Sequence, residues 1–111
     1  MICKIPCPSD VLDFSKVKLT RGESIRVSTD QDKEPCWING MCLVSDDRIV
    51  AVDYNNMSVK LVDVTAGRVL HQLQLKYLPC GVCRMSGDRV AVTLPDAVTI
   101  KVSVYTFITN I

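Results

Sequence analysis

The six cysteines are the residues of this chain best suited to bind a metal or to carry out redox chemistry. Cys80 and Cys83 have the spacing of half a zinc site, but a structural zinc site needs a second such pair or two histidines. The chain has one histidine, His71, which we expect on an exposed outer strand. Redox chemistry of the thioredoxin type needs the cysteine pair at a helix start. We therefore expect buried thiols, with neither a metal nor a cofactor.

A second candidate for chemistry is the group Asp53, Asn55 and Asn56, whose oxygen atoms could bind a divalent cation at the mouth of a propeller. Asp, Asn and Ser are also the usual residues of a tight turn. We interpret the group as a hairpin turn in which Asn takes the left-handed conformation. The sequence shows no nucleophile elbow and no glycine-rich phosphate loop. We therefore expect a protein that is not an enzyme.

The chain contains an internal sequence repeat. The segment from Gly40 to Asp63 recurs 41 residues later, from Gly81 to Val104. Six positions are identical in an alignment without gaps: Gly40/Gly81, Cys42/Cys83, Ser45/Ser86, Asp47/Asp88, Arg48/Arg89 and Lys60/Lys101. Repeats of about 40 residues made of short strands are typical of β-propeller blades. The sequence predicts an all-β partial β-propeller of about two to two and a half four-stranded antiparallel blades.

The repeat divides the chain into four parts. We expect an irregular lead-in over residues 1–13, the end of a preceding blade over 14–35, a complete blade over 36–76, and an incomplete blade with an atypical tail over 77–111. Within the second part, Ser15–Leu19 and Ser24–Ser28 are the expected strands, because the second of these alternates between polar and apolar residues. A propeller needs roughly four to eight blades. We therefore expect a fragment of a longer product, or a chain that assembles with others.

The second strand of each repeat is apolar on both faces. Ile49–Val52 and Val90–Val92 show no alternation with polar residues. A strand in a sheet covered on one face would alternate, whereas a strand covered on both faces need not. Blades that stack face to face cover both faces, which agrees with the propeller prediction.

The repeated residues fall into structural and exposed classes. Recurrence at one place of each blade favours a structural role for eight residues: Gly40, Cys42, Asp47, Arg48, Gly81, Cys83, Asp88 and Arg89. Lys60 and Lys101 are expected to project into solvent. Residues in the turns between strands are the candidates for binding a partner: Asp53, Tyr54, Asn55, Asn56, Pro95 and Asp96.

Charge gives little guidance to the partner. The net charge is +1 at pH 7, and no basic run is present. Because nucleic-acid binding usually requires a basic patch, RNA is a weak expectation. The first ten residues lack the apolar run of a secretory signal, and no stretch is long enough to span a membrane. We expect a cytoplasmic chain with a protein partner and no membrane contact.

The repeat unit resembles the NHL-type propeller repeats at the carboxyl end of tripartite-motif (TRIM) proteins, within the six-bladed, TolB-like propellers. The similarity covers roughly Phe14–Val104 and rests on the Gly-apolar-Cys, Ser-x-Asp-Arg, Val-Lys-apolar-apolar-Asp and Thr-x-Gly-Arg motifs. The resemblance implies a scaffold that presents protein, or in some members RNA, to a ubiquitin-ligase module. The chain has no RING or B-box array, so the resemblance implies an interaction module and no ligase activity. The alternatives are a fragment of a metal-dependent, lactonase-like propeller hydrolase, or an RNA-binding NHL propeller.

Overall fold

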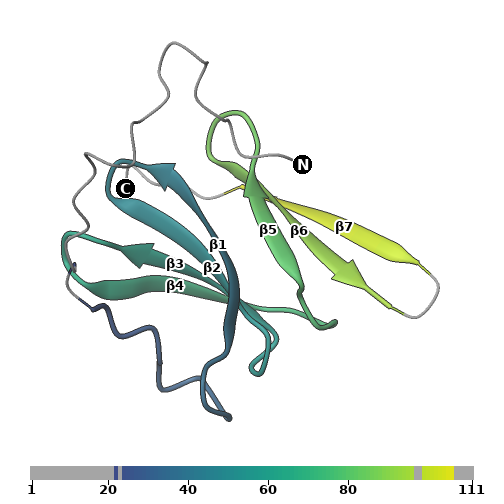
Figure 1. The fold of residues 1–111 in the computed structure, drawn as a ribbon, viewed down its shortest axis with the longest axis horizontal. Helices are drawn as coiled ribbons and strands as arrows, with labels where there is room; N and C mark the ends of the chain where they lie inside the picture. Colours follow the sequence, from purple (N-terminus) through teal and green to yellow (C-terminus); the bar gives the residue numbers. More distant parts are fainter. Residues whose placement is uncertain (1–21, 23, 97–98, 107–111) are drawn as a thin grey trace, which may run out of the picture.

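The computed structural model describes Gly22, residues 24–96 and residues 99–106. These residues form seven strands in two antiparallel sheets (Figure 1). The strands are β1 (Ile38–Ser45), β2 (Arg48–Asp53), β3 (Ser58–Asp63), β4 (Arg68–Gln74), β5 (Gly81–Arg84), β6 (Arg89–Pro95) and β7 (Ile100–Thr106). The first four strands form sheet A in the order β1-β2-β3-β4, and the last three form sheet B in the order β5-β6-β7. The prediction of an all-β partial propeller is confirmed.

The two sheets pack face to face along their first strands. A Cβ atom on Gly40 of β1 would lie 3.5 Å from the Cα atom of Gly81 in β5. The shared core consists of alternate residues of β1, β2, β3 and β6, together with Leu75 directly after β4. All of them are fully or almost fully buried: Val44, Val50, Val52, Val59, Leu61, Leu75, Val90, Val92 and Leu94. Alternate residues of a strand point to opposite faces, so this core occupies one face of each sheet.

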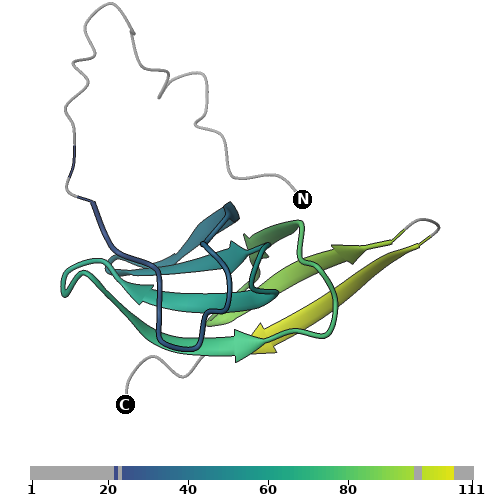
Figure 2. The same cartoon turned by 90° about the horizontal axis from the view of Figure 1, so that it is seen from below.

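The opposite face of sheet A is covered in part by the chain that leads into β1. Figure 2 shows residues 24–36, in dark blue, running along this sheet. Ala51 and Lys60 pair across β2 and β3 on this face, and both are buried. Burial on both faces explains why β2 does not alternate between apolar and polar residues. The positions that would face solvent in a sheet covered on one side here face protein.

The strand expected at Ser24–Ser28 is not formed as a strand in the structure. The segment is extended, with Ile25 and Val27 half-buried and their neighbours exposed. No described strand is hydrogen-bonded beside it, so it lies on sheet A without belonging to a ladder. The expected strand at Ser15–Leu19, the lead-in 1–13 and the end of the tail lie outside the described residues.

The two repeats differ in register after their second strand. In sheet A Ala51 pairs with Lys60. The residue 41 positions after Ala51 is Val92, which pairs with Ser103 of β7. Ser103, and not Lys101, therefore takes the place of Lys60 in sheet B. The hairpin of sheet B carries two additional residues, and the gapless alignment fails beyond it.

Candidate functional site

Lys60 is the centre of a buried cluster on the outer face of sheet A. Its side chain is 0% exposed, which contradicts the expectation that it projects into solvent. The Nζ atom lies 2.7 Å from Asp32 Oδ2 and 2.9 Å from Asp53 Oδ2, and it donates to the carbonyl oxygen of Val27 at 2.8 Å. The ammonium reaches these partners because residues 24–36 cross the sheet directly above it. The cluster joins the crossing segment to the blade.

Local geometry places both carboxylates beside the lysine. Asp53 ends β2 on the same face as Ala51, whose partner across the ladder is Lys60. Diagonal neighbours in an antiparallel pair are within reach of a long side chain. Asp32 lies in a turn that Thr29 closes, because the amide of Thr29 donates to Asp32 Oδ2 at 3.0 Å. Gln72 of β4 donates to the other oxygen of Asp32 at 2.9 Å.

Asn56 extends the network into the β2–β3 turn. Its Nδ2 atom donates to Asp53 Oδ2 at 2.8 Å and to the carbonyl oxygen of Glu34 at 2.9 Å. Its Oδ1 atom accepts the amides of Lys33 and Glu34, each at 2.9 Å. The left-handed residue of this turn is Met57, with a φ of 48°, and not an asparagine as expected. Asn56 instead uses its amide group to bind the crossing segment.

The charges of the cluster favour each other's ionised state. Burial alone would raise the pKa of Asp32 and of Asp53, but hydrogen bonds from Lys60 and other donors outweigh it, and both values fall below the usual range. Burial alone would lower the pKa of Lys60, and the two carboxylates raise it instead. All three groups are therefore charged at neutral pH.

Cys36 completes the cluster but is a poor nucleophile. Its Sγ atom lies 3.2 Å from Asp32 Oδ2 and 3.4 Å from Lys60 Nζ. Burial, followed by the hydrogen bond to the Asp32 carboxylate, raises the pKa of Cys36 to about 11. Reactive cysteines have a lowered pKa, because the thiolate is the nucleophile. The thiol contributes packing and a weak hydrogen bond.

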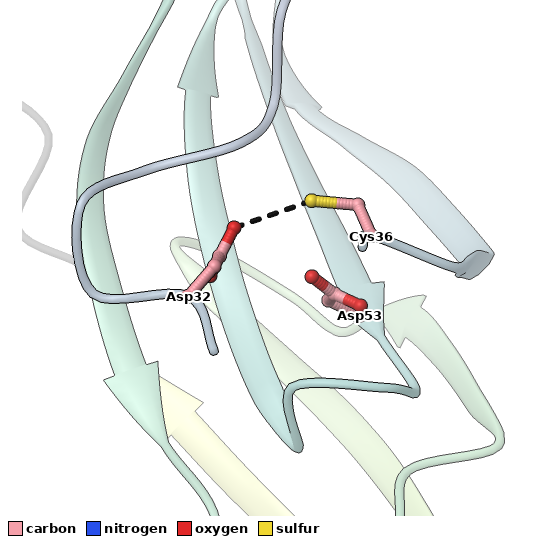
Figure 3. Close-up of side chains that lie close together, drawn as sticks. All are labelled: Asp32, Cys36 and Asp53. Carbon is pink, nitrogen blue, oxygen red and sulfur yellow. Dashed lines mark hydrogen bonds between the residues drawn. The ribbon is translucent and has the colours of Figure 1, made fainter. Parts of the chain in front are cut away.

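Asp32, Cys36 and Asp53 together have the geometry of three metal ligands, since their ligand atoms lie within 4.8 Å of one another (Figure 3). The Lys60 ammonium lies among the same atoms, at hydrogen-bond distance from both carboxylates. Two carboxylates around one ammonium are an ion pair network with its positive charge already supplied. The cluster therefore acts as a clamp between the crossing segment and sheet A.

The candidate partner-binding residues fall into two groups, those buried in this clamp and those exposed to solvent. The side chains of Asp53 and Asn56 are buried in it and do not face solvent. Tyr54 and Asn55 are exposed in the same turn, and Pro95 is exposed at the end of β6 with Asp96 exposed directly after it. Asp96 Oδ1 accepts the amide of Thr99 at 2.7 Å, which closes the turn between β6 and β7.

The recurring Asp-Arg pairs stabilise turns through different partners. Arg48 forms ion pairs with Asp47 at 2.9 Å and with Asp63 at 3.0 Å. Arg89 instead donates to the hydroxyl of Ser86 at 2.8 Å, while Asp88 is exposed.

None of the four described cysteines is fully buried, which contradicts the expectation of buried thiols. Cys42 is half-buried and packs against the shared core. Cys83 is half-buried in β5, and Cys80 is exposed. His71 is exposed on the outer strand β4.

A shallow aromatic groove lies at the end of sheet A where β1 begins. It has a volume of about 290 Å³ and is lined by Trp37, Asn39, Tyr54 and Asn55. Trp37 is 63% exposed and Tyr54 is 39% exposed. Of these four residues, the sequence singled out Tyr54 and Asn55, in the turn after β2, as candidates for binding a partner.

The clamp holds the walls of this groove in place. Asp53 Oδ1 accepts the amide of Trp37 at 3.0 Å, and the amide of Tyr54 donates to the carbonyl oxygen of Trp37 at 2.8 Å. Asn55 Nδ2 donates to the carbonyl oxygen of Pro35 at 2.9 Å. The groove is therefore preorganised by the backbone contacts of its own residues.

Two stacked antiparallel blades with a 41-residue period define a β-propeller repeat protein. A model of the anaphase-promoting complex subunit 4 WD40 domain matches residues 11–86, most of the chain, and the chain belongs to this family. The match supports propeller repeats of the WD40 type and does not support the narrower NHL assignment. A search of curated proteins finds no match to the chain. Among the described residues, no helix is long and apolar enough to cross a membrane.

Proposed function

We propose that the chain is a protein-interaction module that binds its partner through the groove lined by Trp37, Asn39, Tyr54 and Asn55. The observation that carries the proposal is the exposure of two aromatic side chains in a groove with a fixed backbone. Exposed Trp and Tyr residues in pockets are enriched among the residues that dominate binding energy. Backbone order before binding reduces the entropy lost on association.

The chemistry of the groove suits an apolar or aromatic side chain of a protein segment. The walls are mainly apolar, and the amides of Asn39 and Asn55 can hydrogen-bond a peptide backbone at the rim. WD40-type propellers generally serve as non-catalytic interaction modules, which supports a role other than catalysis. The name of the matched family refers to a subunit of a multiprotein complex, and we place this chain in an assembly of that general kind.

The narrower version of the proposal places the chain in the cytoplasm, within an NHL-like propeller of a TRIM-type ubiquitin-ligase protein. Its support is the repeat motifs alone, because the matching family is of the WD40 type. RNA binding by the same face is the competing version. Protein binding and RNA binding predict a different salt dependence of the affinity, since contacts to RNA phosphates weaken steeply as the salt concentration rises.

The test compares partner capture by the wild-type chain and by the double variant Trp37→Ala/Tyr54→Ala. The control is Tyr77→Ala, which removes another exposed aromatic side chain outside the groove. We expect a nuclease-resistant protein partner to be retained by the wild type and the control, and its affinity to fall by at least about tenfold in the double variant. Equal retention by all three chains, or retention of RNA alone, would overturn the proposal.

A further inference from the structure

Sheet B presents an uncovered copy of a surface that is buried in sheet A. By ladder register, Val102 and Val104 of β7 occupy the places of Val59 and Leu61 in β3. Val59 and Leu61 are buried, because sheet B packs on them. Val102, in contrast, is 58% exposed, and Ile100 and Val104 are exposed beside it. This face has the pattern of a blade-packing surface without the following blade.

Sheet A presents the complementary surface at the opposite end of the chain. Met41 of β1 takes the place of Val82 in β5, 41 residues apart, and Leu43 lies two residues further along the same face. Val82 packs against the shared core. Leu43, in contrast, is 60% exposed, and Met41 is exposed with it. The first strand of sheet A therefore lacks the sheet on which the first strand of sheet B rests.

Residues 24–28 lie where the outermost strand of a preceding blade would lie. The carbonyl oxygen of Val27 accepts the Lys60 ammonium on the outer face of sheet A. The position of Lys60 is taken in sheet B by Ser103, which shares a cleft with Leu73 and Leu75 at the end of sheet A. Val27 therefore contacts the outer face of sheet A in the same way as the end of β4 contacts the facing side of sheet B. The described segment thus occupies the place of an outermost strand, although it is extended and not paired in a ladder.

Sheet B, in turn, has no fourth strand among the described residues. It contains three strands where sheet A has four, and no described strand pairs with the outer edge of β7. An unpaired edge is a template for an added strand. The described residues therefore hold one complete blade, three strands of a second, and an extended segment positioned as the fourth strand of another.

We propose that a second copy of this chain completes sheet B, with its Ser24–Ser28 segment pairing with β7 and its Met41 and Leu43 covering Ile100, Val102 and Val104. The occupant is assigned to a second copy because the missing pieces of one copy are the surplus pieces of the next. The contact is head to tail, so each copy uses two different surfaces. If each copy adds the two blades described here, roughly two to four copies would close a ring of propeller size.

The test uses sedimentation velocity of the whole chain over a range of concentrations. Val102→Asp disables one surface and Leu43→Asp the other, and both side chains are exposed, so both variants should keep the fold of a single copy. Val64→Asp, an exposed position in the turn after β3, is the control. We expect the wild type and the control to assemble, and each of the two variants to be monomeric.

Mixing the two variants distinguishes this interface from a symmetrical one. Each variant keeps the surface that the other has lost, so an equimolar mixture should form a one-to-one dimer that does not grow. A wild-type chain that stays monomeric at all concentrations would overturn the proposal, as would a Leu43→Asp variant that still assembles alone.

A second measurement tests the proposal without any substitution, and it therefore does not depend on whether the variants fold. A labelled peptide of residues 22–30 should bind the wild-type chain saturably and shift its assemblies toward smaller species. Absence of binding together with a wild-type assembly that the peptide leaves unchanged would exclude strand addition at β7.

Discussion

The charge of Lys60 determines which segments of the chain pack around it. Burial of an isolated ammonium is very unfavourable, so a buried lysine requires carboxylate partners at close range. Asp32 and Asp53 provide these partners from two different segments. The ion pairs therefore fix where residues 24–36 cross sheet A.

The first prediction concerns the removal of this charge. Lys60→Met keeps an apolar stem of similar length but leaves two buried carboxylates without their cation. We expect a loss of about 3–5 kcal/mol in the free energy of unfolding, because breaking a buried pair leaves an uncompensated charge. Urea denaturation followed by circular dichroism measures this loss.

Lys101→Met is the matched control for that variant. Lys101 is exposed and its Nζ atom lies 3.7 Å from the centre of the Tyr77 ring. Removal of an exposed cation–π contact costs about 0.5–1 kcal/mol. Equal losses for the two variants would show that Lys60 is not a buried clamp.

The second prediction concerns pH. Asp32 and Asp53 have pKa values below those of the unfolded chain, so their contribution to stability is complete above about pH 5 and is lost as the pH falls below about 4. Lys60 has a raised pKa, so its contribution is complete below about pH 10 and is lost as the pH rises above it. Unfolding midpoints in urea should therefore be level between these limits and fall outside them.

Lys60→Met should reverse the acid side of this profile. Without the ammonium, protonation relieves the buried carboxylates, so the variant should become more stable between neutral pH and about pH 4. A profile parallel to that of the wild type would contradict the assignment of the acid dependence to this cluster.

At the scale of the strands, the sequence pattern predicted the elements well and their register poorly. The period of 41 residues and the doubly apolar second strands were sufficient to predict stacked four-stranded blades. The hairpin of sheet B carries two additional residues, and no residue type in the sequence marks that change. Lys60 and Lys101 therefore aligned in sequence although one is buried and the other exposed.

The clamp was not predicted because its members are distant in the sequence. Asp32 and Cys36 belong to a crossing segment whose path depends on the packed sheet beneath it. Alternation alone suggested a paired strand at Ser24–Ser28, and pairing requires a neighbouring strand that the described residues do not supply. The turn at Asp53–Asn56 was identified, but its inward and outward side chains could not be separated without the register.

The third prediction tests the contact between the first strands of the two sheets. Gly40→Ala would place a Cβ atom 3.2 Å from Val52 Cγ2 and 3.5 Å from the backbone of Gly81. Both neighbours belong to the packed interior, so we expect a loss of about 1–3 kcal/mol in the free energy of unfolding. Thermal unfolding measures this loss.

Gly81→Ala provides the comparison. Its Cβ atom would meet the hydroxyl of Thr93 at 3.2 Å and no other atom within 4 Å. Thr93 is half-buried and can change rotamer, so the loss should be smaller than for Gly40→Ala. A larger loss for Gly81→Ala would contradict the tighter packing around Gly40.

At the scale of the whole molecule, the described residues form a pair of propeller blades with an uncovered apolar surface on each blade. Sheet A is covered on one face by sheet B and in part on the other by residues 24–36, whereas sheet B is covered on one face by sheet A. Local stability follows the number of buried contacts and protected hydrogen bonds. The central strands should therefore be the most stable part of the chain, and β7 should depend on assembly.

Amide hydrogen exchange, measured by mass spectrometry at low and high protein concentration, tests this account most directly. We expect slow exchange in β2, β3 and β6, intermediate exchange in residues 24–36 that becomes fast in Lys60→Met, and fast exchange in β7 that slows as concentration rises. Fast exchange of residues 24–36 in the wild type, at the rate of an unstructured peptide, would contradict the docking of this segment on sheet A through the Lys60 cluster.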